Sequence, residues 1–448
     1  MRGIDKEILR LSVPAIVSNV TVPLLGLCDT AIAGHLGSEV FLGAIAIGSL
    51  MLNIVFWLFG FLRAGTTGLT AIALGRGSEP EIRKVFSRAF AIAMLGGSLI
   101  ILLRVPVMEG LLRVVDAAPE VTHLARSYFS ICVWGAPAIL GVMAISGWFV
   151  GMQSTTYPMA IAISVNLINI ALSLLLAFGL KMGFSGVAAG SLLANWLGLA
   201  IALVCARRFR RGRKLWCPMR DIIRRGGLGK FFSVNANLFF RSACIIMVSL
   251  GVTAAGARLG ALTLAINAIM MQFFQLFSFF MDGFAFSAEA LVGRSAGAQD
   301  YPRLCLAVRA LLRWTLGMAL LFTLLYAAGC GPIAAILTDA DIISAGVEDL
   351  RPWIALLPLL SAWAFIYDGF YIGLTRTRRM LLATLCSTLL FYAVAFIDWP
   401  ALSCGDGLHF GISGNRYLWS AFLSYLTLRG VILALLWSST MRRIKRPT

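Results

Sequence analysis

The sequence contains few charged residues for its length. Only 13% of its 448 residues are Asp, Glu, Lys or Arg, whereas 59% are hydrophobic. Soluble proteins are about half apolar and a quarter charged, so an ordinary soluble domain is excluded. The apolar residues form repeated blocks of the roughly 20 residues that a helix needs to cross a membrane. Alternating segments of about ten residues, which are typical of a membrane β-barrel, do not occur.

Residues that bind metals or perform catalysis are scarce and scattered. The three histidines, His35, His123 and His409, are far apart in the sequence. No two of the nine cysteines form a C-x-x-C pair, and most lie inside apolar blocks, as small core residues do. The zinc motifs H-x-x-x-H and H-E-x-x-H are absent, as is a clustered acid pair. We therefore expect no metal site, no cofactor and no enzymatic activity.

The apolar blocks predict about twelve transmembrane helices. No A-x-A-like cleavage site follows the first block, so we expect the first helix to remain in the membrane. The second and eighth blocks exceed the length of one span, which predicts tilted or extended helices. The expected helices cover residues 11–34, 42–72, 85–104, 122–148, 158–180, 185–206, 230–256, 262–293, 304–328, 345–372, 380–400 and 416–440.

The excess of basic residues follows a regular pattern along the chain. The net charge of +18 would suggest a nucleic-acid partner in a soluble protein. Here Lys and Arg concentrate in the even-numbered connections, above all in residues 207–230, and at the C-terminal end. The positive-inside rule then predicts a multi-pass protein of the bacterial inner (plasma) membrane with both termini in the cytoplasm. We expect the basic connections to contact anionic membrane lipid, and no nucleic acid to bind.

An internal repeat divides the chain into two similar parts. At an offset of about 222 residues, Gly75 matches Gly297, and the segment 149–152 matches the segment 371–374. Each part has six expected helices, so both have the same orientation in the membrane. Parallel repeats of this kind build transporters with a central cleft. The expected domains are an N-lobe at residues 1–206, a basic cytoplasmic linker at 207–229 and a C-lobe at 230–448.

One carboxyl group stands out within the first expected helix. Asp29 lies in the stretch Pro23-Leu-Leu-Gly-Leu-Cys-Asp29, and ionisable residues inside a membrane are costly and usually functional. A low-dielectric cavity favours the protonated form of such an acid, as a proton-coupled carrier requires. Pro23 removes a helix hydrogen bond and is therefore a candidate hinge. The structural alternative is a fixed ion pair between Asp29 and Arg63.

The fifth and sixth expected helices contain uncharged polar residues at helical spacing. Asn166, Asn169 and Ser173 share one face of the fifth helix, because they are three and four residues apart. Ser191 and Asn195 are four residues apart on the sixth helix. Together with Arg63 these groups can line a polar cavity in the N-lobe. The alternative is that they form interhelical hydrogen bonds, which Ser and Asn commonly supply in membrane bundles.

The second part of the chain contains its own set of polar residues within expected spans. Asp282 and Glu289 are seven residues apart on the eighth helix and therefore lie on one face. Arg241, Asn267 and Asp368 lie on other helices of the C-lobe or further along the same one. We expect these five residues to form a C-lobe polar cluster. A purely structural pair between Arg241 and one of the acids is the alternative.

Four stretches of the sequence together resemble the multidrug and toxic compound extrusion (MATE) family, in its DNA-damage-inducible protein F branch. The resemblance extends over nearly the whole chain. It implies an all-α membrane protein with two six-helix lobes around a V-shaped cavity. It also implies export of mostly cationic, lipophilic compounds in exchange for protons or sodium. The stretches are residues 23–37, 61–71, 282–290 and 368–376.

The resemblance assigns roles to individual residues. Asp29 falls on the family's first-helix aspartate, which is tied to proton coupling, and Asn169 falls on the asparagine of the first-lobe cation site. Ser191 stands where that site usually has threonine. Ser173 departs from the family pattern, which has an aspartate there, and hard cations prefer anionic oxygen ligands. We therefore expect proton coupling, with sodium as the lesser candidate for the coupling ion. Cys132 stands where relatives often have arginine, and the sequence offers no functional reason for it.

Three alternatives differ from proton-coupled drug export. Sodium-coupled export would use a cation site around other acids. A lipid-linked precursor flippase of the same superfamily would need more cationic residues in its cavity than Arg63 and Arg241. A membrane-embedded enzyme would need a convergent nucleophile, base or metal set, which the sequence does not contain.

Overall fold

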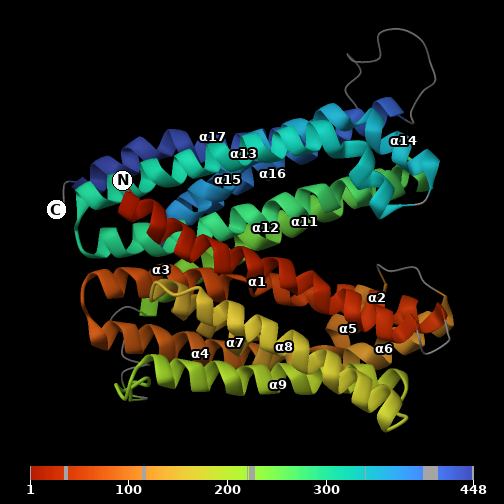
Figure 1. The fold of residues 1–448 in the computed structure, drawn as a ribbon, viewed down its shortest axis with the longest axis horizontal. Helices are drawn as coiled ribbons and strands as arrows, with labels where there is room; N and C mark the ends of the chain where they lie inside the picture. The colour runs from red at the N-terminus through yellow and green to blue at the C-terminus, as the bar shows by residue number, and fades with distance from the viewer. Residues whose placement is uncertain are drawn as a thin grey trace.

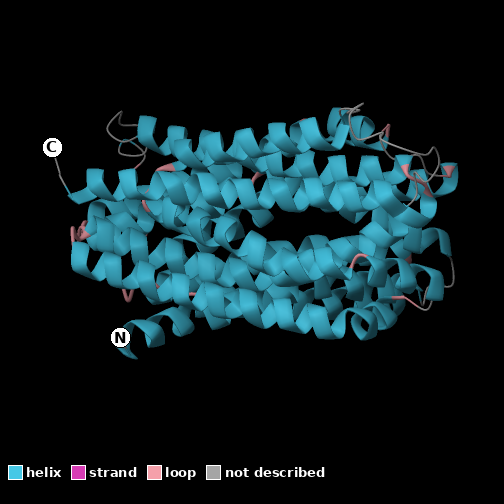
Figure 2. Cartoon of the chain, turned by 90° about the horizontal axis from the view of Figure 1, so that it is seen from above, coloured by secondary structure: helices cyan, strands magenta, loops and turns pink. Residues whose placement is uncertain are grey.

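The computed structural model describes residues 2–34, 39–113, 118–218, 220, 228–338, 340–396 and 412–445. Every regular element in these ranges is a helix, and most helices follow the long axis of the molecule (Figure 2). The elements before residue 210 are α1 (Arg2–Gly34), α2 (Glu39–Leu58), α3 (Phe61–Gly75), α4 (Glu79–Leu102), α5 (Arg104–Leu112), α6 (Pro119–Cys132), η1 (Val133–Gly135), α7 (Ala136–Gly151), α8 (Thr156–Leu174), η2 (Leu175–Gly179) and α9 (Phe184–Phe209). The later elements are α11 (Leu228–Arg258), α12 (Ala261–Gly297), α13 (Tyr301–Leu337), α14 (Asp341–Asp349), α15 (Arg351–Gly373), α16 (Thr377–Phe396) and α17 (Ile412–Lys445).

The helices account for the expected membrane spans. Within the described ranges, 11 segments are long and apolar enough to cross a membrane. They do not include α1, a helix of 33 residues that contains the expected first span. Three expected helices are broken. The span 122–148 is interrupted by the 3₁₀ segment η1 between α6 and α7. The span 42–72 divides into α2 and α3 at a turn through Phe59 and Gly60, and the span 345–372 divides before Pro352, which cannot donate a helix hydrogen bond.

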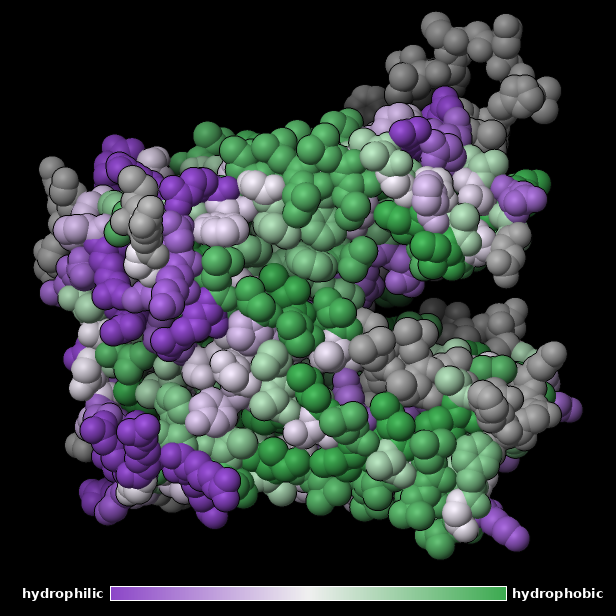
Figure 3. Space-filling model, viewed as in Figure 1, coloured by the Kyte–Doolittle hydropathy of each residue, from purple (hydrophilic) through white to green (hydrophobic). Residues whose placement is uncertain are grey.

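The helices form two groups, which we name the first half (α1–α9) and the second half (α11–α17). The groups lie one above the other in Figure 1, and α1 runs diagonally from the upper group to the lower one. Both chain termini lie at the same end of the molecule (Figure 1). Figure 3 shows an apolar middle region, hydrophilic residues at the ends, and a hollow between the halves at the end away from the termini. The halves therefore enclose a cleft that opens at one end only in this view.

The predicted repeat is confirmed in the backbone conformation. Gly77 and Gln299 both have positive φ angles, of 65° and 57°. Gln153 and Thr375 share the same property, with φ angles of 65° and 54°. The members of each pair are separated by the repeat offset of about 222 residues. Positive φ is uncommon for residues other than glycine, so its occurrence at matching positions shows that the two halves use the same turns.

The backbones of the two halves come into direct contact where α3 crosses α12. A Cβ atom at Gly75 would collide with the carbonyl oxygen of Arg294, and one at Gly297 would collide with the carbonyl oxygen of Ile72. Ile72 and Arg294 are themselves separated by the repeat offset, so the crossing is nearly two-fold symmetric. The two backbones touch because glycine has no side chain at these positions, as small residues commonly allow in membrane helix pairs. We name this contact the α3–α12 crossing.

Glycine-to-alanine substitutions test the α3–α12 crossing. Gly75→Ala should lower the stability of the protein in detergent by about 1–3 kcal/mol, because the added methyl group has no room without a backbone shift. Gly317→Ala on α13 is the matched control, since nothing lies within 4 Å of its added Cβ. There the better helix propensity of alanine should stabilise by about 0.5–1 kcal/mol. Melting temperatures that move in the same direction for both variants would contradict the crossing.

Candidate functional site

A chain of three polar side chains connects α8, α9 and α1 in the first half. The Asn169 side-chain amide donates to the Ser191 hydroxyl at 2.7 Å, and this hydroxyl donates to Oδ2 of Asp29 at 3.0 Å. All three residues are buried, and Asp29 is 4% exposed. The structure thus places Asp29, the expected proton-coupling residue, beside Asn169 and Ser191, which the resemblance assigns to the first-lobe cation site.

Two residues of α6, Tyr128 and Cys132, complete the surroundings of Asp29. Neither was a predicted site residue, and Cys132 was noted only as a departure from the family pattern. The Tyr128 side chain interacts electrostatically with the Asp29 carboxylate, and its ring packs against Gly48 of α2. The Cys132 thiol lies 3.6 Å from the carbonyl oxygen of Ala188 on α9. Tyr128 and Cys132 are also the titratable groups that face Asp29. No sequence spacing links α6 to α1, so Tyr128 could not be found from the sequence.

The carboxylate of Asp29 has no cationic partner among the described residues. Arg63, the partner considered from the sequence, lies in another cluster. Oδ1 of Asp29 and Oδ1 of Asn169 are buried acceptor atoms without a hydrogen-bond donor in the described part of the chain. Burying an ionised carboxyl group with only neutral partners is costly. The negative charge therefore needs a proton or a bound cation to neutralise it.

The remaining predicted residues of the first half bond to backbone groups. The Asn166 amide donates to the Thr21 carbonyl oxygen of α1 at 2.7 Å. The Ser173 hydroxyl donates to the Val187 carbonyl oxygen at 3.4 Å, and the Asn195 amide donates to the Ser191 carbonyl oxygen at 2.8 Å. These three residues therefore connect helices or bond within one helix. Pro23, the predicted hinge, falls within α1, but its side chain lies outside the described residues.

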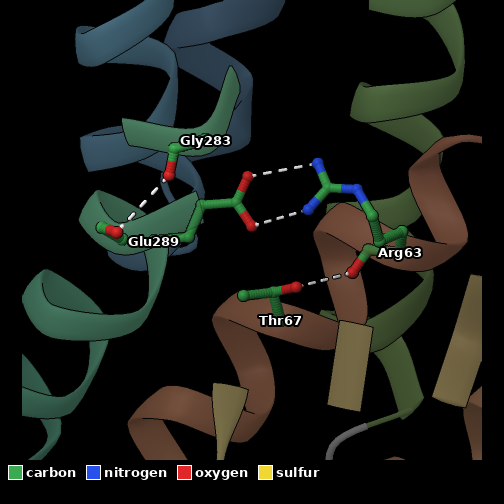
Figure 4. A network of polar contacts seen from close by, with 5 residues as sticks. Arg63, Thr67, Gly283 and Glu289 are labelled. Atoms are coloured by element: carbon green, nitrogen blue, oxygen red, sulfur yellow. Dashed lines mark hydrogen bonds and ion pairs between the residues drawn. The ribbon is translucent and has the colours of Figure 1, made fainter. Parts of the chain in front are cut away.

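Arg63 pairs across the two halves. Its guanidinium group on α3 forms two hydrogen bonds with the carboxylate of Glu289 on α12, at 3.1 and 3.3 Å (Figure 4). The guanidinium carbon also lies 3.8 Å from the ring centroid of Phe286. Thr67 donates to the Arg63 carbonyl oxygen from the next turn of α3. Glu289 is 1% exposed, so this buried, bidentate pair joins the halves beside the α3–α12 crossing.

Asp368 pairs with two arginines in the second half. Arg241 of α11 and Arg429 of α17 both contact Oδ2 of Asp368 on α15, the latter at 3.3 Å. Arg429 is 4% exposed in its side chain and also donates to the Tyr425 hydroxyl at 3.2 Å. Arg429 was not predicted as a site residue, although an arginine near the middle of an apolar helix is itself a signal.

The other two residues of the expected C-lobe cluster differ in their surroundings. Asp282 interacts electrostatically with Arg63, Arg241, Glu289 and Asp368, but forms no hydrogen bond or ion pair with a described residue. Asn267 lies about four helical turns before Asp282 on α12 and accepts a hydrogen bond from the Trp419 indole at 2.7 Å. The structure therefore brings four of the five residues together and leaves Asn267 apart.

Comparison with known proteins identifies the family of this chain. The MatE family profile matches residues 14–175 and again 238–397, one match in each half. The chain is 34% identical over 433 residues to DNA damage-inducible protein F of Escherichia coli K12, covering 97% of this chain and 92% of the relative. The chain belongs to the MatE family. It is a multidrug efflux-type MATE transporter of the inner membrane, crosses that membrane several times, and is surrounded by lipid.

More distant relatives and solved structures agree with this fold. The chain is 24% identical over 461 residues to the probable multidrug resistance protein NorM of Xanthomonas axonopodis, covering 97% of this chain and 94% of NorM. A MATE crystal structure in the bent conformation superposes with a TM-score of 0.86 at 18% identity, over 99% of this chain and 96% of that one. A mutant of the Vibrio cholerae MATE transporter VcmN gives a TM-score of 0.85 at 16% identity, over 98% of each chain. The predicted family and fold class are thus confirmed.

Removing the shared carboxylate tests the arginine cluster of the second half. Asp368→Asn should destabilise the MATE chain by about 3 kcal/mol or more, because it leaves the buried groups of Arg241 and Arg429 without their ion-pair partner. Asp349→Asn is the control, since its pair with Arg416 is exposed and should contribute at most about 1 kcal/mol. Melting temperatures in detergent measure both. Equal shifts for the two variants would show that the buried cluster does not stabilise the fold.

Proposed function

We propose that this MATE transporter is a proton-coupled antiporter that exports small, mostly cationic and lipophilic compounds. Asp29 binds the coupling proton. Asn169 and Ser191 position its carboxylate through the hydrogen-bonded chain from α8 and α9. Sodium is the lesser candidate for the coupling ion.

The contacts of Asp29 are the observation that supports this proposal. A buried carboxylate that is held by neutral donors and lacks an ion pair has a charge that must be neutralised by what it binds. A proton needs only this one group. When a proton is exchanged for a singly charged cationic substrate, the site keeps the same net charge before and after the exchange.

The surroundings of Ser173 count against a sodium site in the first half. Sodium, as a hard cation, favours several oxygen ligands with negative charge. Ser173 is fully buried between α8 and α9, where Gly190 packs directly against it, and its hydroxyl bonds to a backbone carbonyl. The position therefore supplies neither a carboxylate nor the space for one.

The pairing of the buried and partly buried arginines counts against a lipid-linked precursor flippase. Such a substrate carries a pyrophosphate, which needs cationic groups that are free to bind it. Arg63 pairs with Glu289, and Arg241 and Arg429 both pair with Asp368. Asp282 has no such pair with a described residue and adds negative charge to the same region, which favours a cationic substrate electrostatically.

The orientation follows from the charge pattern. We propose that both termini lie in the cytoplasm, because the basic connections lie at the same end of the molecule as the termini. The hollow between the halves is at the opposite end, so the described conformation faces outward (Figure 3). The proposed N-lobe, linker and C-lobe keep the boundaries 1–206, 207–229 and 230–448, except that the start of α1 packs on the second half.

Transport into inverted membrane vesicles tests the proposed function. With an imposed proton gradient, the parent should accumulate a cationic dye without sodium, and Asp29→Asn should abolish this accumulation because it removes the titratable group. Glu120→Gln is the control, since it neutralises an exposed acid at the start of α6 in the same half. Dye uptake and its sodium dependence are measured for all three proteins.

Two results would overturn the proposal. Uptake by the parent that is driven by sodium alone would point to a cation site elsewhere, first around Asp282 and Glu289. Uptake by Asp29→Asn at the rate of the parent would show that another group binds the coupling ion.

A further inference from the structure

We infer that α1 is a strut between the halves, and that Glu7 and Arg303 are positioning residues that anchor its start to the second half. The strut passes a displacement of the Asp29 segment to α13. This inference rests on the proposed role of Asp29 in coupling, but it concerns residues far from Asp29 along α1.

The first turns of α1 belong to the core of the second half. Ile4, Ile8 and Leu11 are buried in one cluster with side chains of α12, α13 and α15. The Ser12 and Ser287 hydroxyls form a hydrogen bond of 2.7 Å between α1 and α12. The first turns of α1 therefore pack within the second half, although their position in the sequence assigns them to the first half.

Charged groups fasten the same turns to α13. Both carboxylate oxygens of Glu7 accept hydrogen bonds from Arg303 at 2.9 Å. Asp5 accepts hydrogen bonds from the Trp314 indole at 3.0 Å and from Arg313 at 2.6 Å. These bonds from Trp314 and Arg313 hold the pKa of Asp5 below its usual value of 3.8, so its charge is lost only in strong acid. The ion pair of Asp5 with Arg313 therefore keeps its charge at neutral pH.

Along α1 the side-chain hydrogen bonds beyond residue 18 pass from the second half to the first, although Thr155 of the first half already donates to the Arg10 carbonyl oxygen at 3.5 Å. The Asn19 amide donates to the Phe279 carbonyl oxygen of α12 at 3.2 Å, which is the last side-chain hydrogen bond to the second half among the described residues of α1. The Thr21 carbonyl oxygen already accepts from Asn166 of α8 in the first half. Asp29 follows about two turns later. Figure 1 shows the resulting diagonal course of α1 across the molecule.

The two acids of this anchor are not repeated at the equivalent positions of the second half of the sequence. At the repeat offset of about 222 residues, Asp5 and Glu7 correspond to Gly227 and Gly229. The first turns of α11 do pack on the first half, since Asn235 lies against Gly65 of α3. The sequence therefore does not repeat Asp5 and Glu7 at the equivalent positions before α11. The helix that holds the proposed proton site is anchored by charged groups at its start.

A continuous helix that is fixed at one end and displaced at the other must transmit the displacement, bend, or break its anchor. The anchor consists of two ion pairs and a buried apolar face, whereas Pro23 lacks the N–H that would bond to the Asn19 carbonyl oxygen. A displacement of α1 at Asp29 is therefore transmitted to α13 as long as the Glu7–Arg303 ion pair stays formed.

Hydrogen exchange measured by mass spectrometry tests the strut without any transport assay. Asp29→Asn, which mimics the neutral acid, should change the exchange rates of residues 301–316 at the start of α13 relative to the parent. In an Arg303→Gln background the same substitution should change exchange in the first half only. In an Arg213→Gln background, which removes an exposed ion pair within the first half, the response at 301–316 should persist.

Proteoliposome transport gives the functional readout. Glu7→Gln and Arg303→Gln should each lower proton-driven transport about three- to tenfold with substrate affinity unchanged, while Arg213→Gln retains the parent rate. The exchanged pair Glu7→Arg with Arg303→Glu should restore most of the transport, which a simple folding defect in the single variants would not allow.

The outcomes separate this inference from the proposed function. A response to Asp29→Asn at residues 301–316 that survives in Arg303→Gln, or that is absent in the parent, would overturn the strut. A parent that shows no proton-driven transport would overturn the proposed function, and the exchange experiment would still decide the strut.

Discussion

The α3–α12 crossing is the contact on which the arrangement of the two halves depends. Helices in lipid gain little from burying apolar surface against each other, because the lipid chains are equally apolar. Close backbone packing must supply the stability instead. Gly75 and Gly297 allow this packing at the end of the molecule that holds the termini, and the halves diverge toward the opposite end. The cleft exists because the close contact is confined to one end.

The two halves have the same backbone turns but differ in the partners of their buried charged residues. In the first half, one buried carboxylate has only neutral hydrogen-bond partners among the described residues. In the region where the halves meet and in the second half, three arginines face three acids, and each of these arginines is paired. Ion pairs hold helices in one arrangement, whereas the charge of an unpaired carboxyl group depends on whether it binds a proton or a cation. The repeat makes the backbones of the two halves similar, whereas the unpaired acid lies in the first half and most of the buried ion pairs lie in the second.

The sequence predicted the features that depend on composition and spacing, but not which helices lie side by side. The spacing of glycines located the repeat that the positive φ angles confirm, and the resemblance named the three residues that hydrogen bonds join around Asp29. Arg63 was placed with the first-half residues, but its partner Glu289 lies on α12, and Tyr128 was missed because α6 has no sequence relation to α1. Membrane helices are apolar on most faces, so their sequence pattern gives little information about which face meets which neighbour.

The course of α1 adds a constraint on how the cleft can close. The α3–α12 crossing and the anchor of α1 on α13 both involve the second half at or near the end of the termini, and Arg63 joins the halves between them. A rotation of the halves about the crossing leaves the start of α1 with the second half and carries its end with the first. The part of α1 between Asn19 and Asp29 must then absorb the change in angle. That part contains Pro23 and ends at the carboxylate whose charge depends on what it binds, so the bend and the proton site occupy the same two to three turns of one helix.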